Sequence, residues 1–267
     1  MTSGIFAQNF GKQGYTLLEA APWKHDVEDI KIAITDAMKA DGVKIIRETD
    51  GVTPRSLANP HHVNALLGSI AHDKAIATIA ADLLGSDVYV FQLGINLKQP
   101  LSGDIWYWHR DFPTYHHQDH IPENRMVNVL IYLDDFNRDN GSFMVVPGSH
   151  EAKSEHGAMS GMGTSHTLYY AGRDEIAEAV QLNGISFLDG AAGSVVFMNT
   201  NLLHGSGANL SASPRRLITL TLNAIDNKAT CRSNRPELVD DDRPATGILF
   251  GGVAQPQKGK AEAVAPR

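Results

Sequence analysis

The sequence predicts a mainly β protein with a helical part at its N-terminus. From Asp87 on, short runs rich in β-branched and aromatic residues alternate with Gly, Asn and Asp clusters that are typical of turns. Before that point, apolar residues recur at the spacing of amphipathic helices. Many strands separated by tight turns indicate a barrel or jelly roll of the cupin kind.

The N-terminal part is expected to hold three helices and one strand. Residues 26–40 place apolar side chains at helical spacing, begin with acidic residues and stop at Gly42, as dipole and capping rules favour. A short strand is expected at 43–48, and two further helices at 59–67 and 73–84. These elements are predicted to pack against the strand-rich part.

The strand-rich part is expected to form the core. Its strands are predicted at 88–98, 106–109, 126–133, 143–146, 193–198 and 216–224. The run Asp139-Asn140-Gly141 is a strong tight-turn signal between two of them. We expect a single domain over 1–267, made of a helical region at 1–85, a metal-binding β core at 86–235, a lid-like insertion at about 150–190 and a loose tail at 252–267.

Composition narrows the classes of function. The formal charge of -7 and the pI near 5.9 argue against nucleic acids or anionic membranes as main partners. The single cysteine, Cys231, excludes a disulfide framework within the chain and suits a reducing, cytoplasmic location. No apolar run approaches the ~18 residues of a membrane-spanning helix, and the N-terminus does not resemble a secretory signal.

The run 105–112, Ile-Trp-Tyr-Trp-His-Arg-Asp-Phe, carries the first chemical signal. In an extended strand, residues i and i+2 point to the same face, so His109 and Asp111 can share one target. They would supply two corners of a 2-His-1-carboxylate iron site. The alternatives are a surface hydrogen-bonded pair, or a site built instead on the second His-x-Asp, His117 and Asp119.

A third candidate ligand lies downstream. His204 follows the predicted strand 193–198 and is next to glycines that allow close backbone approach. Arg215 begins the next predicted strand, and its guanidinium suits an anionic co-ligand beside a metal.

The strand at 88–98 has a polar face. Its alternation places Gln92, Asn96 and Lys98 on one side of an otherwise apolar strand. Such a face either meets solvent or lines a pocket, and the sequence alone leaves both open.

Three blocks of sequence resemble the phytanoyl-CoA dioxygenase family. They are Trp108-His-Arg-Asp-Phe112, Asn140-Gly-Ser-Phe-Met-Val-Val-Pro-Gly-Ser-His150 and His204-Gly-Ser-Gly-Ala-Asn-Leu-Ser-Ala-Ser-Pro-Arg215. Members are Fe(II)/2-oxoglutarate oxygenases on a double-stranded β-helix. The resemblance covers about 85–235, and within the family the chain looks most like the bacterial ectoine hydroxylases and the free L-proline trans-4-hydroxylases.

The resemblance implies roles for individual residues. It assigns His109, Asp111 and His204 to iron, and it assigns Arg215, Ser206 and Lys98 to 2-oxoglutarate. Gln92 is implied to contact the substrate, and we expect Asn96, Trp108 and Tyr115 to complete that pocket. Ectoine hydroxylases carry Trp where this chain has Tyr115, and the run 118–122 also differs, so the resemblance does not assign ectoine as the substrate.

The expected reaction is hydroxylation of an unactivated C–H of a small amino-acid-like molecule, such as proline or a relative, with 2-oxoglutarate and O2 giving succinate and CO2. Iron halogenases of this type replace the carboxylate ligand with a small residue, whereas Asp111 is present here. The alternatives are an ectoine-type hydroxylase and a non-enzymatic cupin-like binding protein. The expected partner is a small-molecule substrate, and the chain is expected to be a monomer or a homodimer.

Overall fold

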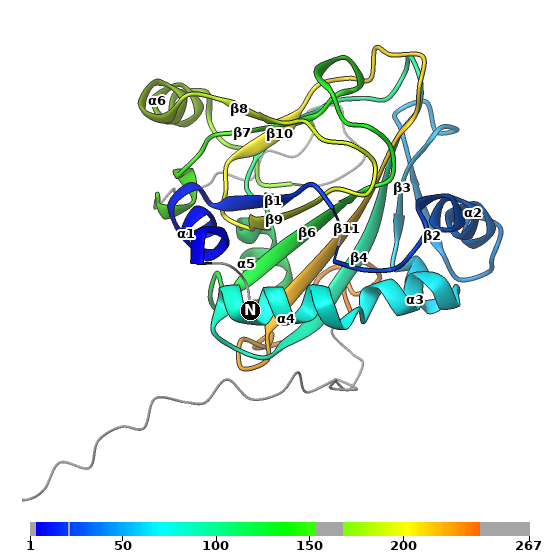
Figure 1. Cartoon of the computed structure of the whole chain (residues 1–267), viewed down its shortest axis with the longest axis horizontal. Coiled ribbons are helices and arrows are strands. Elements are labelled where there is room, and N and C mark those ends of the chain that lie inside the picture. Colours follow the sequence, from blue (N-terminus) through cyan, green and yellow to red (C-terminus); the bar gives the residue numbers. More distant parts are fainter. Residues whose placement is uncertain (1–3, 21, 153–167, 241–267) are drawn as a thin grey trace, which may run out of the picture.

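The structure, a computed structural model, describes residues 4–20, 22–152 and 168–240. They form two antiparallel sheets that face each other, with helices on the outer side of the larger sheet (Figure 1). In sheet order, the large sheet holds β1 (Tyr15–Leu18), β9 (Val195–Asn199), β6 (Met126–Tyr132), β11 (Arg215–Ala224), β4 (Val88–Lys98), β3 (Pro54–Ala58) and β2 (Lys44–Arg47). The small sheet holds β5 (Trp106–His109), β10 (His204–Ser206), β7 (Phe143–Val145) and β8 (Ser186–Leu188). This arrangement confirms the predicted jelly roll.

The helices confirm the predicted N-terminal part in outline. They are α1 (Gly4–Gln13), α2 (Val27–Ala37), α3 (Ala65–Ala71), α4 (Lys74–Leu84), α5 (Phe112–Asp119) and α6 (Arg173–Asn183). The side chains of Asp26, Asn64 and Asp73 accept the first free N–H groups of α2, α3 and α4. The helix predicted at 59–67 is wrong in detail, because a 3-10 turn, η1 (Pro60–His62), precedes α3. In Figure 1, α3 and α4 lie along the side of the large sheet that faces away from β7, β8 and β10.

Strand β6 is buried on both faces. Val127, Val129 and Ile131 pack into the core under the helices, whereas Leu130 and Tyr132 pack into the core between the sheets. Burying each such side chain contributes about 1.5–3 kcal/mol. Because side chains alternate along a strand, Asn128 also points between the sheets. A single polar residue is thereby placed inside an otherwise apolar strand.

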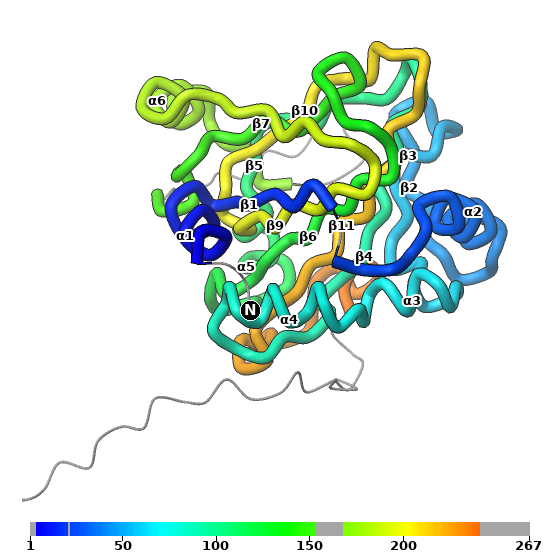
Figure 2. Tube along the Cα trace, in the orientation of Figure 1, coloured from blue at the N-terminus to red at the C-terminus, as the bar shows by residue number. Residues whose placement is uncertain are grey.

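Several strands lie outside the expected set. The N-terminal strand β1 pairs with β9, and Figure 2 shows these distant segments side by side. β2 confirms the strand expected at 43–48, whereas β3, which lies between β2 and β4 in the large sheet, was not expected. β8, inside the insertion expected at 150–190, pairs with β7 and belongs to the small sheet. Of the lid-like insertion expected at about 150–190, residues 153–167 lie outside the described residues, and so does the tail expected at 252–267.

The predicted turn at Asp139-Asn140-Gly141 is confirmed, as the end of a second 3-10 turn, η2 (Arg138–Asn140). Gly141 has φ 79°, a left-handed conformation that glycine adopts without strain. A Cβ built on Gly141 would lie 2.4 Å from the Gly207 carbonyl oxygen, so no other residue fits there without movement. The turn therefore brings backbone oxygens close to the start of β11.

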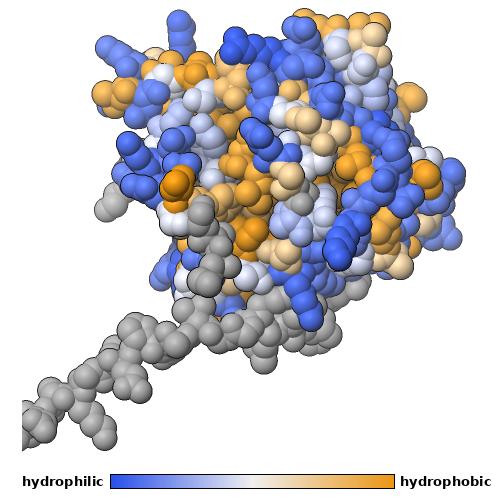
Figure 3. Space-filling model, viewed as in Figure 1, coloured by the Kyte–Doolittle hydropathy of each residue, from blue (hydrophilic) through white to orange (hydrophobic). Residues whose placement is uncertain are grey.

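Polar residues predominate around the rim of the face shown in Figure 3, and apolar residues gather toward its middle. Within the described residues, no helix has the length and apolar character needed to cross a membrane.

Candidate active site

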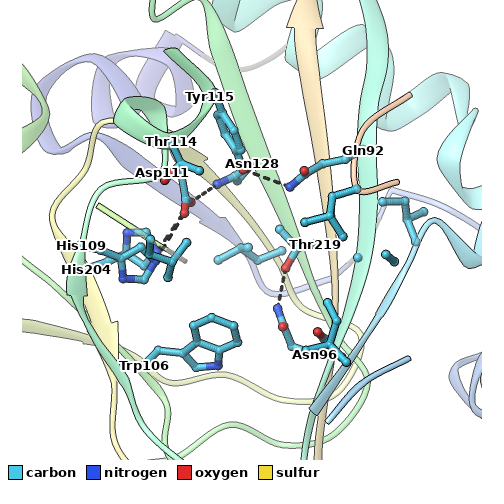
Figure 4. Close-up of a pocket in the computed structure, with 18 of the residues that line it drawn as sticks. Gln92, Asn96, Trp106, His109, Asp111, Thr114, Tyr115, Asn128, His204 and Thr219 are labelled. Atoms are coloured by element: carbon cyan, nitrogen blue, oxygen red, sulfur yellow. Dashed lines mark hydrogen bonds and ion pairs between the residues drawn. The ribbon is translucent and has the colours of Figure 1, made fainter. Parts of the chain in front are cut away.

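A cavity of about 140 Å³ lies between the two sheets. Gln92 and Asn96 reach it from β4, Asn128 from β6, and His109 and His204 from the small sheet (Figure 4). The polar face predicted for residues 88–98 therefore lines a pocket and does not face solvent. Lys98 continues the same row and is buried.

His109, Asp111 and His204 converge at one end of this cavity. His109 and His204 are directly opposite each other on β5 and β10, with ring centroids 4.2 Å apart. Nε2 of His109 lies 3.4 Å from Asp111 Oδ1, and Nε2 of His204 lies 3.7 Å from Asp111 Oδ2. One ligand atom from each residue lies within 4.8 Å of the other two. This is the donor set that holds non-haem Fe(II) and leaves coordination positions open.

The hydrogen bonds of the two imidazoles fit a metal. His109 Nδ1 lies 2.6 Å from Tyr107 O, and His204 Nδ1 lies 2.9 Å from Leu202 O. A carbonyl oxygen only accepts, so Nδ1 is the donor and the neutral ring directs its Nε2 lone pair at Asp111. Burial, with nearby His109, lowers the pKa of His204 to about 4, so that ring is neutral at pH 7. A lone pair facing a carboxylate is repulsive unless a cation lies between them.

Asp111 reaches the site by a route that differs from the expected one. Its backbone is helical, with φ -79° and ψ -38°, and it precedes α5. The expectation that His109 and Asp111 converge as alternate residues of one strand is therefore wrong. The chain turns at Asp111, whose N–H donates to Thr200 O at 2.9 Å. Burial opposes charge on Asp111, but the Asn128 amide, which donates to Oδ2 at 2.6 Å, helps to hold its pKa below the usual value, so it is a carboxylate.

His204 also differs from the expectation in detail. It does follow β9, but it begins β10, a strand of its own that pairs with β5 and β7. The neighbouring Gly205 is needed for this pairing, because a Cβ there would lie 3.0 Å from Trp106 O.

The rival His-x-Asp does not form a site. His117 is exposed on α5, whereas Asp119 is buried and pairs with Arg235. His117 and Asp119 therefore lie in different surroundings.

A second group of two histidines and an aspartate has a different character. Asp240 accepts from His61 Nε2 at 2.8 Å and from His62 Nε2 at 2.6 Å, which are hydrogen-bond distances. Within the described residues, the buried His61 Nδ1 has no partner, so no backbone carbonyl turns the Nε2 lone pair toward the carboxylate. We interpret this group as a hydrogen-bonded clamp that holds the segment ending at Asp240.

The three polar side chains predicted to bind 2-oxoglutarate are buried, and none of them is among the residues that line the cavity. Lys98 and Arg215 are register partners on β4 and β11, and Ser206 ends β10. Arg215 Nε and Ser206 Oγ have no hydrogen-bond partner among the described residues. Burial, with the positive charges of Arg215 and Arg55, lowers the pKa of Lys98 to about 6. Orphaned donors and crowded cations fit an anionic ligand with two carboxylates.

The residues expected in the substrate pocket are only partly found there. Gln92, Asn96 and Tyr115 line the cavity, as predicted, but Trp108 does not. Trp108 instead packs with Val146, Ala171 and Leu203, so its expected place in the pocket is corrected.

Trp106 is the indole that lines the cavity. The register between β5 and β10 shifts, so that three steps from Trp106 to His109 oppose two steps from Ser206 to His204. This bulge places Trp106 and His109 on one face although an odd number of positions separates them. Arg55 lies over the Trp106 ring, with Cζ 4.0 Å from its centroid.

Sequence reasoning also missed Asn128 and Arg235. Asn128 could have been noticed as the one polar residue in the buried run 126–132. Arg235 gives no such signal, because it follows the last predicted strand in a polar segment. It lines the cavity, and its Nε lies 3.0 Å from each oxygen of Asp119.

Comparisons with known proteins agree with this geometry. The sequence matches the phytanoyl-CoA dioxygenase (PhyH) family over residues 10–217. It is 32% identical to the ectoine dioxygenase of Bordetella bronchiseptica, over 82% of this chain and 75% of that protein. It is 30% identical to the L-proline trans-4-hydroxylase of Streptomyces griseoviridis, over 87% of this chain and 91% of that protein. The crystal structure of EctD from S. alaskensis with 2-oxoglutarate and 5-hydroxyectoine superposes with a TM-score of 0.75 and 29% identity, covering 91% of this chain and 82% of that one.

Two facing sheets that present two histidines and an aspartate to an internal cavity define an iron oxygenase of the double-stranded β-helix class. The chain belongs to the phytanoyl-CoA dioxygenase family and is an Fe(II)/2-oxoglutarate-dependent dioxygenase. This conclusion sets aside the non-enzymatic cupin-like binding protein.

Proposed function

We propose that the protein hydroxylates an unactivated C–H of a small amino-acid-like substrate, with His109, Asp111 and His204 as the iron ligands. The observation that carries this proposal is the convergence of the two Nε2 atoms and the carboxylate on a small cavity. A complete triad, with Asp111 present, favours hydroxylation over chlorination.

Arg215, Lys98 and Ser206 are proposed to hold 2-oxoglutarate. Arg215 is wholly buried, and its guanidinium lies over the Phe136 and Phe143 rings, which fix its plane. Its Nη1 donates to Gly141 O at 3.2 Å, which leaves Nε without a partner among the described residues. A carboxylate of the co-substrate would satisfy this donor.

The opposite end of the cavity suits a zwitterion. Arg235, which is paired with Asp119, offers its remaining guanidinium N–H groups, and Gln92 and Asn96 offer amides. Tyr115 and Trp106 add aromatic walls, the usual composition of a small-molecule site. The named substrates of the two relatives, ectoine and L-proline, are both small molecules, which supports this class.

Bound iron supplies the O2 chemistry that couples decarboxylation of 2-oxoglutarate, to succinate and CO2, with hydroxylation of the substrate. The residues of the chain orient the reactants and exclude water. Holding the C–H beside the metal makes an intermolecular reaction effectively intramolecular.

An ectoine-type substrate is the second candidate, favoured by the similarity to ectoine dioxygenases. The experiment is to incubate the iron-loaded protein with 2-oxoglutarate and a panel of free amino acids and ectoine. Succinate release together with a gain of one oxygen on a panel member supports the proposal. Succinate release that no panel member stimulates would contradict the substrate class.

A further inference from the structure

A row of hydrogen bonds joins the Asp111 carboxylate of the triad to the Gln92 amide, and Figure 4 shows its two ends, Asn128 beside Asp111 and Gln92 beside Tyr115. Asn128 Nδ2 donates to Asp111 Oδ2 at 2.6 Å, and Thr221 Oγ1 donates to Asn128 Oδ1 at 2.7 Å. Tyr115 Oη lies 3.4 Å from Thr221 Oγ1, and Gln92 Nε2 donates to Tyr115 Oη at 3.1 Å. The row comes from α5 and three neighbouring strands of the large sheet, β4, β11 and β6.

The donor and acceptor capacities of the side chains determine which group donates at each step of this row. An ionised carboxylate only accepts, so the Asn128 amide must turn its NH2 to Asp111 and its Oδ1 to Thr221. Thr221 has one hydroxyl hydrogen and gives it to Asn128, so it can only accept from Tyr115. The Tyr115 hydroxyl then gives its single hydrogen to Thr221 and accepts from Gln92. Starting from Asp111, each group that must accept a hydrogen bond thus determines which group donates to it.

Burial preserves this direction. Asn128 and Thr221 are each 0% exposed, and Tyr115 is 4% exposed, so bulk water does not offer substitute partners. Burial and the negative charge of Asp111 raise the pKa of Tyr115, so its hydroxyl keeps the proton that the row requires. Inside a protein an unpaired polar group lowers stability, which disfavours reversal of any one member.

We propose that Asn128, Thr221 and Tyr115 act as positioning residues that orient the Asp111 carboxylate for the metal and, at the other end, turn the Gln92 amide. This inference rests on the proposed function of the site. Asn128 holds Asp111 Oδ2 and thereby fixes the plane of the carboxylate. Gln92 uses its NH2 on Tyr115, so its Oε1 remains to accept from a ligand.

The direction of the row therefore determines which hydrogen-bonding group the pocket offers to the substrate. No hydrogen bond within the described residues involves Gln92 Oε1, so the cavity presents an acceptor there. A substrate with an N–H or ammonium donor satisfies it, whereas an acceptor at the same place would leave two oxygens facing each other. Arg235, which is paired with Asp119, also lines the cavity and has further guanidinium N–H groups to donate, so a substrate with both a donor and an acceptor, such as an amino acid, is favoured over a simple carboxylic acid.

Metal affinity of the full-length, substrate-free protein tests the positioning role. Thr221→Val keeps the shape of the side chain but removes the hydroxyl, so the Asn128 amide loses the partner that fixes its orientation. Thr221→Ser restores the hydroxyl. Thr219→Val removes another cavity hydroxyl, one that accepts from Asn96 Nδ2 at 3.1 Å and lies outside the row.

We expect Thr221→Val to bind Co²⁺, a redox-stable substitute for Fe(II), about 3-fold to 30-fold more weakly than the unchanged protein. This loss is smaller than the roughly 10-fold to 100-fold that follows removal of a direct partner of a metal ligand, because Thr221 acts through Asn128. Thr221→Ser and Thr219→Val should stay within about twofold of it. His109→Ala measures Co²⁺ bound elsewhere, and thermal unfolding confirms that each variant is folded.

Unchanged affinity in Thr221→Val overturns the proposal, and so does an equal loss in Thr221→Ser or Thr219→Val. No substrate is present in this measurement, so failure of the proposed reaction leaves its outcome unchanged. Conversely, Co²⁺ binding in His109→Ala that is as tight and as stoichiometric as in the unchanged protein would refute the iron ligands themselves.

Discussion

Lys98 and Arg215 lie directly opposite each other on β4 and β11, so two cationic side chains are buried side by side. Lys98 Nζ donates to the Gly207 carbonyl, and no carboxylate takes that place among the described residues. Burial and the charge of Arg215 lower the pKa of Lys98 to about 6. Two buried basic side chains, with no carboxylate at Lys98 Nζ among the described residues, fit a dianionic ligand.

The first prediction is that 2-oxoglutarate binding takes up a proton. Above pH 6 Lys98 is mostly neutral in the free protein, and a bound carboxylate raises its pKa toward the ordinary 10.5. Affinity should therefore be highest below about pH 6 and fall by up to about tenfold per pH unit above it. Calorimetry in two buffers of different ionisation enthalpy checks the uptake at about pH 7.5. Lys98→Met should lose the pH dependence, and a pH-independent affinity in the unchanged protein would refute this role of Lys98.

The second prediction separates two adjacent arginines. Arg215→Ala should weaken 2-oxoglutarate binding by about 10-fold to 100-fold, because a charge-assisted contact is lost. Arg216 points to the other face of β11 and pairs with Asp134 at 2.7 Å, so Arg216→Ala is the matched control. The two apparent KM values, for 2-oxoglutarate and for the prime substrate, provide the measurement. Equal increases in both would argue against a co-substrate role for Arg215.

Prediction of the fold from sequence worked where a pattern was long and regular. The periodicity of β4, β6 and β11 identified the large sheet, and turn residues such as Gly141 marked their ends. The short strands β1, β3, β8 and β10 were missed because three to five residues carry too little periodicity, and their pairing depends on partners elsewhere in the chain.

The site residues could be predicted where residue type and the neighbouring sequence identify them. His109, Asp111 and His204 stand out by residue type and by the elements that precede them, but the helical turn that directs Asp111 into the cavity was not visible. Trp108 was predicted to line the pocket, whereas Trp106 does so. The reason is a bulge that depends on the partner strand β10 and is not visible in the sequence of β5.

The third prediction concerns the triad. His109→Ala and His204→Ala should each lose iron and turnover together, because two remaining ligands hold Fe(II) poorly. His117→Ala should keep both, since that side chain is exposed and outside the cavity. Iron content after desalting, measured beside turnover at limiting iron, checks this. Normal iron in either triad variant would show that the ligands are misassigned.

The fourth prediction concerns the segment 235–240, which contributes residues to the wall of the cavity. Asp240 is clamped by His61 and His62, while Arg235 and Leu238 of the same segment line the cavity. Asp240→Asn should raise the KM for the prime substrate several-fold and speed amide exchange in 235–240, with little effect on 2-oxoglutarate. Glu237→Gln breaks only the exposed pair with Lys44, worth about 0–1 kcal/mol, and is the control.

The clamp also has a defined pH dependence. Burial opposes the charge on Asp240, but His61 and His62 together hold its pKa below the ordinary 3.8. Its contribution to stability is therefore present above pH 3.8 and is lost as the pH falls through the lower pKa of the folded state. Amide exchange in 235–240 that is equal in Asp240→Asn and the unchanged protein would contradict the clamp.

The most direct test is to weigh the product. The protein is supplied with iron, 2-oxoglutarate, O2 and chloride, together with free amino acids, ectoine and a long-chain acyl thioester. We expect one added oxygen on a free amino acid, with succinate formed in equal amount. A chlorinated product would contradict the role given to Asp111, and oxygen added only to the acyl thioester would contradict the amino-acid pocket.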